Sequence, residues 1–179
     1  MPKIKVCINP GHDKQLDSGA VNQGAGLREA DVNDKVAKKV VNLLNADAAY
    51  EAEYVQSNEL QSICDKANNS QADLFISIHC NAFKDATAHG VETWYCPGSA
   101  KGGKLAGNIQ DNLLQATGLY NREAKAGNFY VLEKTSMPAV LIEIAFVTNY
   151  DEAKLLKNDQ WLDKVALAIV DGIKQYSNG

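Results

Sequence analysis

The strongest strand signal in the chain is residues 73–79, which read Asp-Leu-Phe-Ile-Ser-Ile-His. The run is short, largely apolar and rich in β-branched and aromatic residues, which is typical of a strand that is buried on both faces. Strands of this kind belong mainly to parallel sheets that helices cover on both sides. The segment therefore favours an α/β fold, and it places His79 at the end of a buried strand.

Strand and helix patterns alternate on both sides of this run. Helices are indicated where apolar residues recur at steps of three and four, and strands where short apolar runs end at Gly, Pro or Asn. The predicted strands are residues 3–8, 50–56, 73–79, 90–96, 129–132 and 139–144, and the predicted helices are residues 30–44, 60–69, 105–116, 151–156 and 162–176. We expect one three-layer α/β/α domain over residues 1–179, with a mostly parallel central sheet.

Composition and charge exclude several classes of protein. The 179 residues suit one hydrophobic core, and 45% hydrophobic with 22% charged residues is ordinary globular usage. A formal net charge of −4 without a run of Lys and Arg disfavours nucleic acid and anionic membranes as partners. No stretch approaches the roughly 18 apolar residues of a membrane span, and the start lacks the apolar segment of a signal peptide. We expect a soluble chain without an export signal.

Cysteine and histidine are both sparse. The four cysteines are far apart and form no CxxC pattern, so we expect reduced and mostly buried thiols at Cys7, Cys64, Cys80 and Cys96. The three histidines are His12, His79 and His89, of which His89 lies in a polar segment and is expected at the surface.

Two histidines and two glutamates are predicted to meet at one edge of the sheet. His12 and His79 mark the ends of two strands, Glu143 lies towards the end of a third, and Glu29 lies at the entrance of the first long helix. The ligand crevice of such a sheet lies at the carboxyl ends of its strands. Two imidazoles and one carboxylate suit a catalytic zinc ion, with the other carboxylate as general base. The alternative is hydrogen-bonded loop histidines and solvated glutamates, and spacing alone leaves both interpretations open.

A second motif points to different chemistry. Residues 98–105, Gly-Ser-Ala-Lys-Gly-Gly-Lys-Leu, nearly match a phosphate-binding loop between a strand and a helix. However, Leu105 replaces the hydroxyl residue that would hold Mg²⁺, and no later apolar strand ends in a clear Asp. Nucleotide binding is therefore disfavoured.

Seven blocks occur in a fixed order along the chain, at residues 9–12, 17–20, 26–31, 72–82, 90–93, 121–122 and 137–143. They read Asn-Pro-Gly-His, Asp-Ser-Gly-Ala, Gly-Leu-Arg-Glu-Ala-Asp, Ala-Asp-Leu-Phe-Ile-Ser-Ile-His-Cys-Asn-Ala, Gly-Val-Glu-Thr, Asn-Arg and Met-Pro-Ala-Val-Leu-Ile-Glu. The set resembles the zinc-dependent N-acetylmuramoyl-L-alanine amidases of the Amidase_3 type, found in bacterial autolysins, sporulation hydrolases and phage endolysins. The resemblance runs from the first strand to the last helix.

The resemblance implies a single Zn²⁺ bound by His12, Glu29 and His79, with Glu143 as the catalytic carboxylate. It implies peptidoglycan as substrate, cut at the amide that joins the lactyl group of N-acetylmuramic acid to L-alanine of the stem peptide. Two other classes remain open, a zinc exopeptidase on a similar fold and a non-catalytic wall-binding module.

The resemblance also carries finer expectations. Asn81 and Arg122 match positions near the family's cleft, where they would contact substrate or serve a structural role. Departures from the family's usual residues, at Asp13, Ile63 and Glu123, leave the ligands intact but put substrate contacts in doubt. The stretch 97–128 is too short to add the inhibitory helix of some relatives, so we expect an open site.

The expected place of action is the bacterial cell wall. The absence of an export signal fits a phage lysin released from the cytoplasm or the excised domain of a secreted hydrolase. No wall anchor is evident, so a separate or covalently linked cell-wall-binding module is the expected partner.

Overall fold

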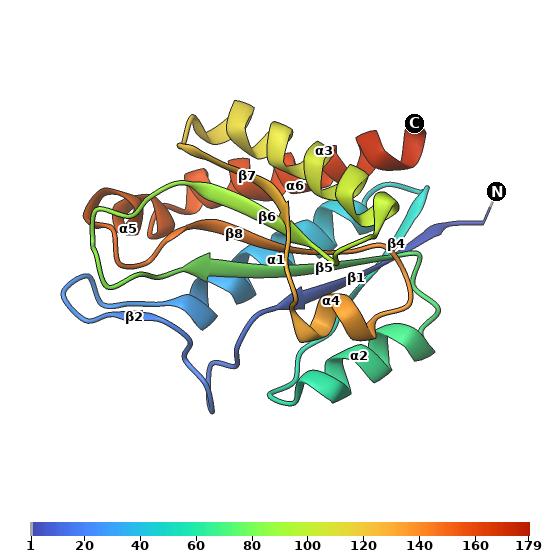
Figure 1. Ribbon diagram of the computed structural model, residues 1–179, viewed down its shortest axis with the longest axis horizontal. Coiled ribbons are helices and arrows are strands. Elements are labelled where there is room, and N and C mark those ends of the chain that lie inside the picture. Colours follow the sequence, from blue (N-terminus) through green and yellow to red (C-terminus); the bar gives the residue numbers. More distant parts are fainter. Residues whose placement is uncertain (1) are drawn as a thin grey trace.

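A six-stranded sheet forms the centre of the molecule, in a computed structural model that describes residues 2–179 (Figure 1). In order across the sheet, the strands are β4 (Tyr50–Tyr54), β1 (Ile4–Pro10), β5 (Leu74–Asn81), β8 (Ala139–Phe146), β6 (Val91–Tyr95) and β7 (Asn121–Ala126). Neighbouring strands are parallel except β8 and β6, which are antiparallel. The mostly parallel sheet expected from the sequence is therefore confirmed.

Helices cover both faces of this sheet, as Figure 1 shows. One face packs against α1 (Glu29–Asn45), α3 (Ala100–Thr117), α5 (Tyr150–Leu156) and α6 (Asp159–Asn178). The other face packs against α2 (Leu60–Asn69) and α4 (Tyr130–Lys134). This is the predicted three-layer α/β/α arrangement. Among the described residues, no helix is both long and apolar enough to cross a membrane.

The two faces explain why the strands read as continuous apolar runs. Side chains alternate between the faces, so in β1 Val6 and Ile8 join one buried cluster while Cys7 joins the other. In β5, Leu74, Ile76 and Ile78 join the first cluster, and Phe75 joins the second. Both faces of these strands are buried away from water, so apolar residues are favoured at every position except those that serve the site or form a buried polar pair.

One predicted element is wrong, and another begins earlier than predicted. The strand predicted at residues 129–132 is the start of the short helix α4. The helix predicted at residues 105–116 begins earlier, at Ala100, because Ser99 accepts a hydrogen bond from the Gly102 N–H and caps the helix. Most of the phosphate-loop match is therefore helix. A Cβ on Gly102 would lie 2.8 Å from the Ser99 Oγ, so this glycine serves packing rather than a loop.

Two further strand regions had no counterpart in the prediction. Strand β7 has the polar sequence Asn-Arg-Glu-Ala-Lys-Ala, since it lies at the edge of the sheet and is largely exposed or half-buried. The other is a short hairpin of β2 (Val21–Asn22) and β3 (Leu27–Arg28), which leads into α1. Strands this short or this polar carry no apolar pattern to detect.

Candidate metal centre

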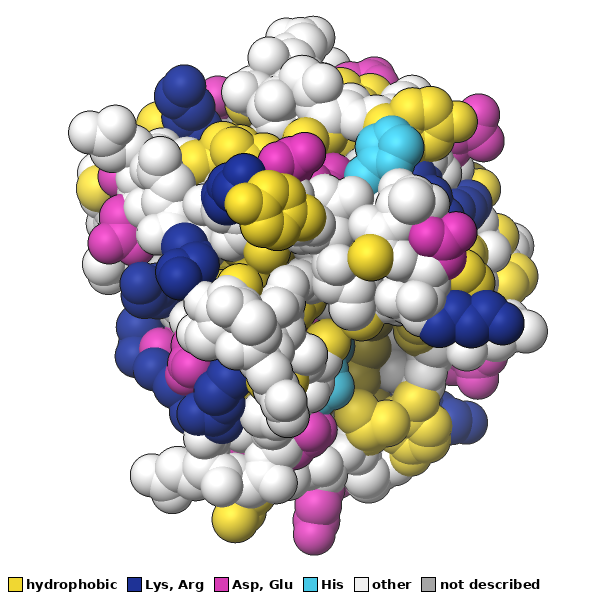
Figure 2. Space-filling model, turned by 90° about the vertical axis from the view of Figure 1, so that its left-hand side faces the viewer, with side chains coloured by type: hydrophobic (Ala, Val, Ile, Leu, Met, Phe, Trp, Pro, Cys, Tyr) yellow, Lys and Arg dark blue, Asp and Glu magenta, His cyan; other side chains and the backbone are white. Residues whose placement is uncertain are grey.

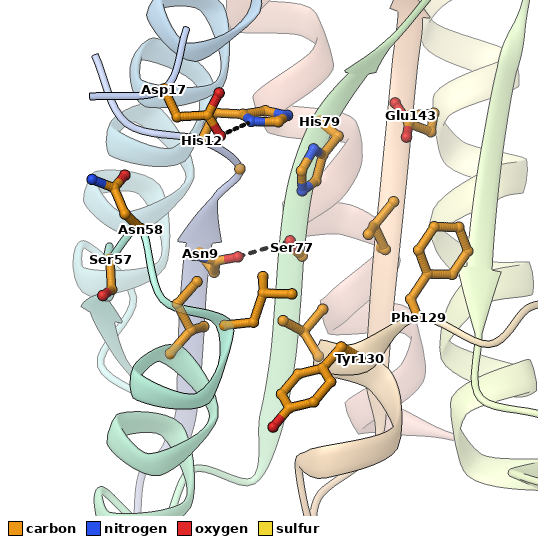
Figure 3. A pocket seen from close by; sticks show the side chains of 15 residues that line it. Asn9, His12, Asp17, Ser57, Asn58, Ser77, His79, Phe129, Tyr130 and Glu143 are labelled. Atoms are coloured by element: carbon orange, nitrogen blue, oxygen red, sulfur yellow. Dashed lines mark hydrogen bonds and ion pairs between the residues drawn. The ribbon is translucent and has the colours of Figure 1, made fainter. Parts of the chain in front are cut away.

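Three separate elements bring His12, Glu29 and His79 together. His12 follows β1, Glu29 is the first residue of α1, and His79 lies two residues before the end of β5. Each side chain offers one ligand atom, and these atoms all lie within 4.8 Å of one another. The two imidazole rings meet edge to face, with centroids 5.2 Å apart. Figure 3 shows the two side chains next to each other. The sequence prediction that these residues converge is therefore confirmed by the geometry.

Glycines make room for this cluster. A Cβ on Gly11 would lie 2.0 Å from the His79 ring, and a Cβ on Gly19 would lie 2.6 Å from both the Glu29 carboxylate and the His12 ring. Gly19 also has φ +61°, and His12 itself has φ +65°, which is uncommon for a residue with a side chain. The backbone thus adopts the left-handed conformation at His12, where this histidine contributes its side chain to the cluster.

Glu29 is the hub of the cluster. Its Oε2 lies 3.3 Å from His12 Nε2 and its Oε1 lies 3.0 Å from His79 Nδ1. The same carboxylate accepts hydrogen bonds from the backbone N–H groups of Ala20 and Cys80. Burial by itself raises the pKa of Glu29, but the hydrogen bonds from His12 and His79 outweigh it and hold the pKa well below its usual range. The site therefore presents a carboxylate anion between two imidazoles.

Asp17 orients one of these imidazoles. Its Oδ2 lies 2.7 Å from His12 Nδ1, as the dashed line in Figure 3 marks, and its Oδ1 accepts the Gly19 N–H. Nε2 faces the Glu29 carboxylate at 3.3 Å and donates to it; a metal bound there would take the place of that proton, while Asp17 would still hold Nδ1. The hydrogen bond with Glu29, followed by that with Asp17, raises the pKa of His12 to about 9 against the opposing effect of burial. The sequence contained Asp17 in a motif block but gave it no role.

Glu143 stands beside the cluster on the neighbouring strand. It pairs in register with His79 across β5 and β8, and Figure 3 shows both side chains on the same side of the sheet. Its Oε2 is inaccessible to solvent and is the buried side-chain polar atom without a hydrogen-bond partner among the described residues. Burial, and then the charges of Glu29 and Glu92, raise its pKa well above the usual value. The interpretation of Glu29 and Glu143 as solvated surface glutamates is therefore wrong.

A cavity of about 250 Å³ opens next to these residues. Figure 2, which views the carboxyl edge of the parallel strands, shows a hollow between a histidine side chain and hydrophobic side chains. Asn9 and Ser77 form the floor, where the Ser77 hydroxyl donates to Asn9 Oδ1 at 2.8 Å. The further lining residues are Gly11, His12, Asp17, Ser57, Asn58, Leu60, Ile63, His79, Phe129, Tyr130, Val131, Leu141 and Glu143. The segment 97–128 forms α3 and β7 and leaves this cavity open, as expected.

The other residues singled out in the sequence lie elsewhere. Asn81 and Arg122 do not line the cavity; both contact Glu92, at 2.8 Å and 2.9 Å. His89 is exposed in the loop after β5, with its Nδ1 2.8 Å from the Thr87 carbonyl oxygen. The four thiols are free, and all but the half-buried Cys96 are buried, as expected.

Fold and donor set define a class, the α/β domains with a potential single-metal site at the carboxyl edge of the sheet. Within that class, residues 6–175 match the family described as N-acetylmuramoyl-L-alanine amidase, Amidase_3. The chain belongs to this family.

Similar proteins agree with this assignment. Over 177 residues the chain is 42% identical to the N-acetylmuramoyl-L-alanine amidase LytC of Bacillus subtilis. The matched region covers 96% of this chain but only 35% of LytC. It is 36% identical to the endolysin of Bacillus phage SPP1, covering 97% of the chain and 66% of the endolysin. The chain thus spans about a third of the one relative and two thirds of the other.

Solved structures extend the agreement to three dimensions. The N-acetylmuramoyl-L-alanine amidase from Clostridium difficile 630 superimposes with a TM-score of 0.91 at 34% identity, covering 99% of this chain and 98% of that one. The amidase AmiC2 of Nostoc punctiforme gives a TM-score of 0.92 at 32% identity, covering 99% of both chains.

Proposed function

We propose that this chain hydrolyses the amide between N-acetylmuramic acid and L-alanine in peptidoglycan, using Zn²⁺ held by His12, Glu29 and His79. Membership of the amidase family supports the reaction. The observation that carries the site is the convergence of two imidazole nitrogens and a buried carboxylate oxygen within 4.8 Å. Nitrogen and oxygen donors of this kind suit Zn²⁺, and three protein ligands leave a coordination position for substrate or water.

When bound, zinc would supply Lewis acidity, polarising the amide carbonyl and lowering the pKa of water. Glu143 would accept the proton of the attacking water and deliver it to the departing alanine nitrogen. Burial raises the pKa of this carboxyl group, and a more basic carboxylate is a better acceptor for the proton of water. Glu143 also lines the cavity beside His12 and His79, where the water and the amide would be bound.

Replacing Glu143 tests this role. Glu143→Gln removes the proton acceptor and is expected to lower turnover by roughly 10²- to 10⁴-fold while zinc content stays at one ion per chain. Turnover is measured on purified peptidoglycan and zinc by elemental analysis. The matched control is Glu133→Gln, an exposed glutamate on α4, which should behave as the unaltered protein. Normal turnover by Glu143→Gln would show that another group moves the proton.

Product analysis separates the proposed reaction from its alternatives. Digestion of purified sacculi by an amidase exposes new L-alanine amino groups without new reducing sugar ends. A zinc exopeptidase would instead release free amino acids, and a wall-binding module would sediment with the sacculi without digesting them. Loss of digestion with EDTA and its return with Zn²⁺ would support the metal.

We further propose that the chain acts at the bacterial cell wall. The endolysin of phage SPP1 and the amidase LytC among its relatives support this location. Both relatives extend beyond the matched region, which is consistent with a linked wall-binding module in proteins of this family.

A further inference from the structure

A second charged cluster lies beside Glu143, and its centre is Glu92 on β6. This residue is buried, and four donors hold its carboxylate. Oε1 accepts from Asn81 Nδ2 at 2.8 Å and Trp94 Nε1 at 3.2 Å. Oε2 accepts from Arg122 Nε and Lys125 Nζ, both at 2.9 Å. We call these five residues the Glu92 cluster.

The Glu92 cluster carries more positive than negative charge. One carboxylate faces one guanidinium and one ammonium group, so a net charge of +1 remains. Arg122 and Lys125 are 34% and 33% exposed, respectively, whereas the Glu92 side chain is 6% exposed. The negative charge is therefore buried and the positive charges reach the solvent.

Both cations are also fixed in position by aromatic rings. The Arg122 guanidinium lies 5.0 Å from the centroid of Phe146, and the Lys125 ammonium lies 4.6 Å from that of Trp94. Such contacts, added to the hydrogen bonds with Glu92, reduce the freedom of two long side chains before any ligand arrives. A ligand that bound here would meet a preorganised pair of donors and lose less entropy on ordering them.

The Glu92 cluster adjoins the proposed reaction centre. Glu92 pairs directly with Glu143 across β6 and β8, a register that places their side chains as neighbours on one face. Trp94 lies against Phe129 with ring centroids 5.3 Å apart, and Phe129 lines the cavity beside Glu143. Glu143 therefore lies between the cavity and Glu92, whose carboxylate holds the two half-buried cations.

We propose that Arg122 and Lys125 form a subsite that binds a free carboxylate on the peptide arm of the substrate. The inference rests on the proposed function, because the amide cut in that reaction divides the substrate into a sugar arm and a peptide arm. The acid group of the muramic acid is consumed in the amide that is cut, so the sugar arm next to that amide carries no charge. The peptide arm keeps its free carboxylates. A guanidinium and an ammonium group side by side suit such an anion.

Two matched substrates test the subsite. One is a muropeptide with a free carboxylate on the residue that follows L-alanine, and the other carries a carboxamide there. The unaltered protein is expected to cleave the carboxylate substrate with a kcat/KM about tenfold higher, the worth of one charge-assisted contact. Most of the difference should lie in KM, and added salt should reduce it because screening weakens the attraction.

Substitutions at Lys125 and Arg122 test whether these two residues cause the preference for the carboxylate substrate. Lys125→Met keeps the apolar stem over Trp94 but removes the charge, and it should bring the ratio of the two kcat/KM values close to one. Arg122→Gln should do the same, whereas Arg122→Lys, which keeps the charge, should retain part of the preference. Lys101→Met, an exposed lysine on α3, is the control and should leave the ratio unchanged. Thermal unfolding shows which variants fold, and the salt dependence of the unaltered protein tests the subsite without any variant.

The outcomes distinguish two kinds of failure. Equal cleavage of both substrates by the unaltered protein overturns the subsite and leaves the proposed function intact. A preference that survives Lys125→Met and Arg122→Gln also overturns it, as does an equal rise of KM for both substrates, which would indicate a structural role alone. If neither substrate is cut at the muramoyl amide, the proposed function itself fails.

Discussion

Gly11 decides where the His79 ring can lie. Because its absent Cβ would fall 2.0 Å from that ring, Gly11→Ala must displace the imidazole or the backbone of the loop. We expect a loss of at least tenfold in zinc affinity, measured by competition with a chelator of known affinity. Gly107→Ala is the matched control, since a Cβ there meets nothing within 4 Å inside α3, and it should stabilise the fold by about 0.5–1 kcal/mol. Unchanged zinc affinity in Gly11→Ala would place the metal away from His79.

Asp17 contacts His12, one of the three proposed zinc ligands. Asp17→Asn keeps the shape of the side chain but weakens its hold on the Nδ1 proton of His12, and we expect zinc affinity to fall roughly 10- to 100-fold. The chelator competition measures this directly. Asp85→Asn, in an exposed loop, serves as control. Equal affinities for the two variants would mean that the loop alone orients His12.

At this scale the sequence predicted the residues that meet, but not the residues that orient them. His12, Glu29, His79 and Glu143 could be placed because strand ends and the start of a helix fix their edge of the sheet. Asp17 could not, because its contact with His12 depends on a tight loop closed by a glycine at φ +61°.

At the scale of elements, the antiparallel step from β8 to β6 brings Glu92 opposite Glu143. Burial alone raises the pKa of Glu92, but Lys125 and Arg122 outweigh burial and hold it below the usual value. A carboxylate whose pKa is lowered on folding stabilises the protein above its unfolded pKa of about 4.5, and this stabilisation is lost as the pH falls through the folded pKa.

Glu92→Gln should therefore destabilise the protein in a pH-dependent way. Near pH 7 the loss of a buried partner for two cations is expected to cost about 1–3 kcal/mol. The difference from the unaltered protein should shrink below about pH 4.5, where the carboxyl group of the unfolded chain begins to be protonated, and vanish as the pH falls through the lower pKa of the folded state. Denaturant unfolding at several pH values measures it. A difference independent of pH would show that packing, not charge, is what the substitution removes.

Elements were predictable to the extent that they are buried on a periodic face. The strands β1, β5 and β8 and the helices α1, α2 and α6 are all buried in this way, and the sequence located them within a few residues. Strand β7 escaped prediction because an edge strand has a polar face, and its pairing with β6 is determined by tertiary context. Helix α4 was mistaken for a strand because five residues are too few to show a helical period.

At the scale of the whole molecule, the three proposed zinc ligands come from the loop after β1, from α1 and from β5, so zinc binding would bear on the stability of the entire fold. A ligand that binds only the native state at a free concentration 100 times its Kd adds about 2.7 kcal/mol. For a domain of this size that corresponds to a rise in Tm of roughly 5–10 °C. We expect EDTA to lower Tm by this amount and Zn²⁺ to restore it, measured by calorimetry. His79→Ala should show no such response, and a response equal to that of the unaltered protein would contradict the proposed ligand set.

The two ends of the described chain lie together, away from the cleft. Residues Pro2, Lys3 and Ile4 line one depression together with Tyr176 and Ser177. Figure 1 shows both ends of the chain at the amino edge of the parallel strands. A module fused at either end would therefore be tethered behind the cleft and would not obstruct it. Such a tether would raise the effective concentration of wall polymer at the cleft by keeping it close after each cut. Under the proposed function, the length of the linker would then determine how strongly the wall is retained, with no change to the reaction centre.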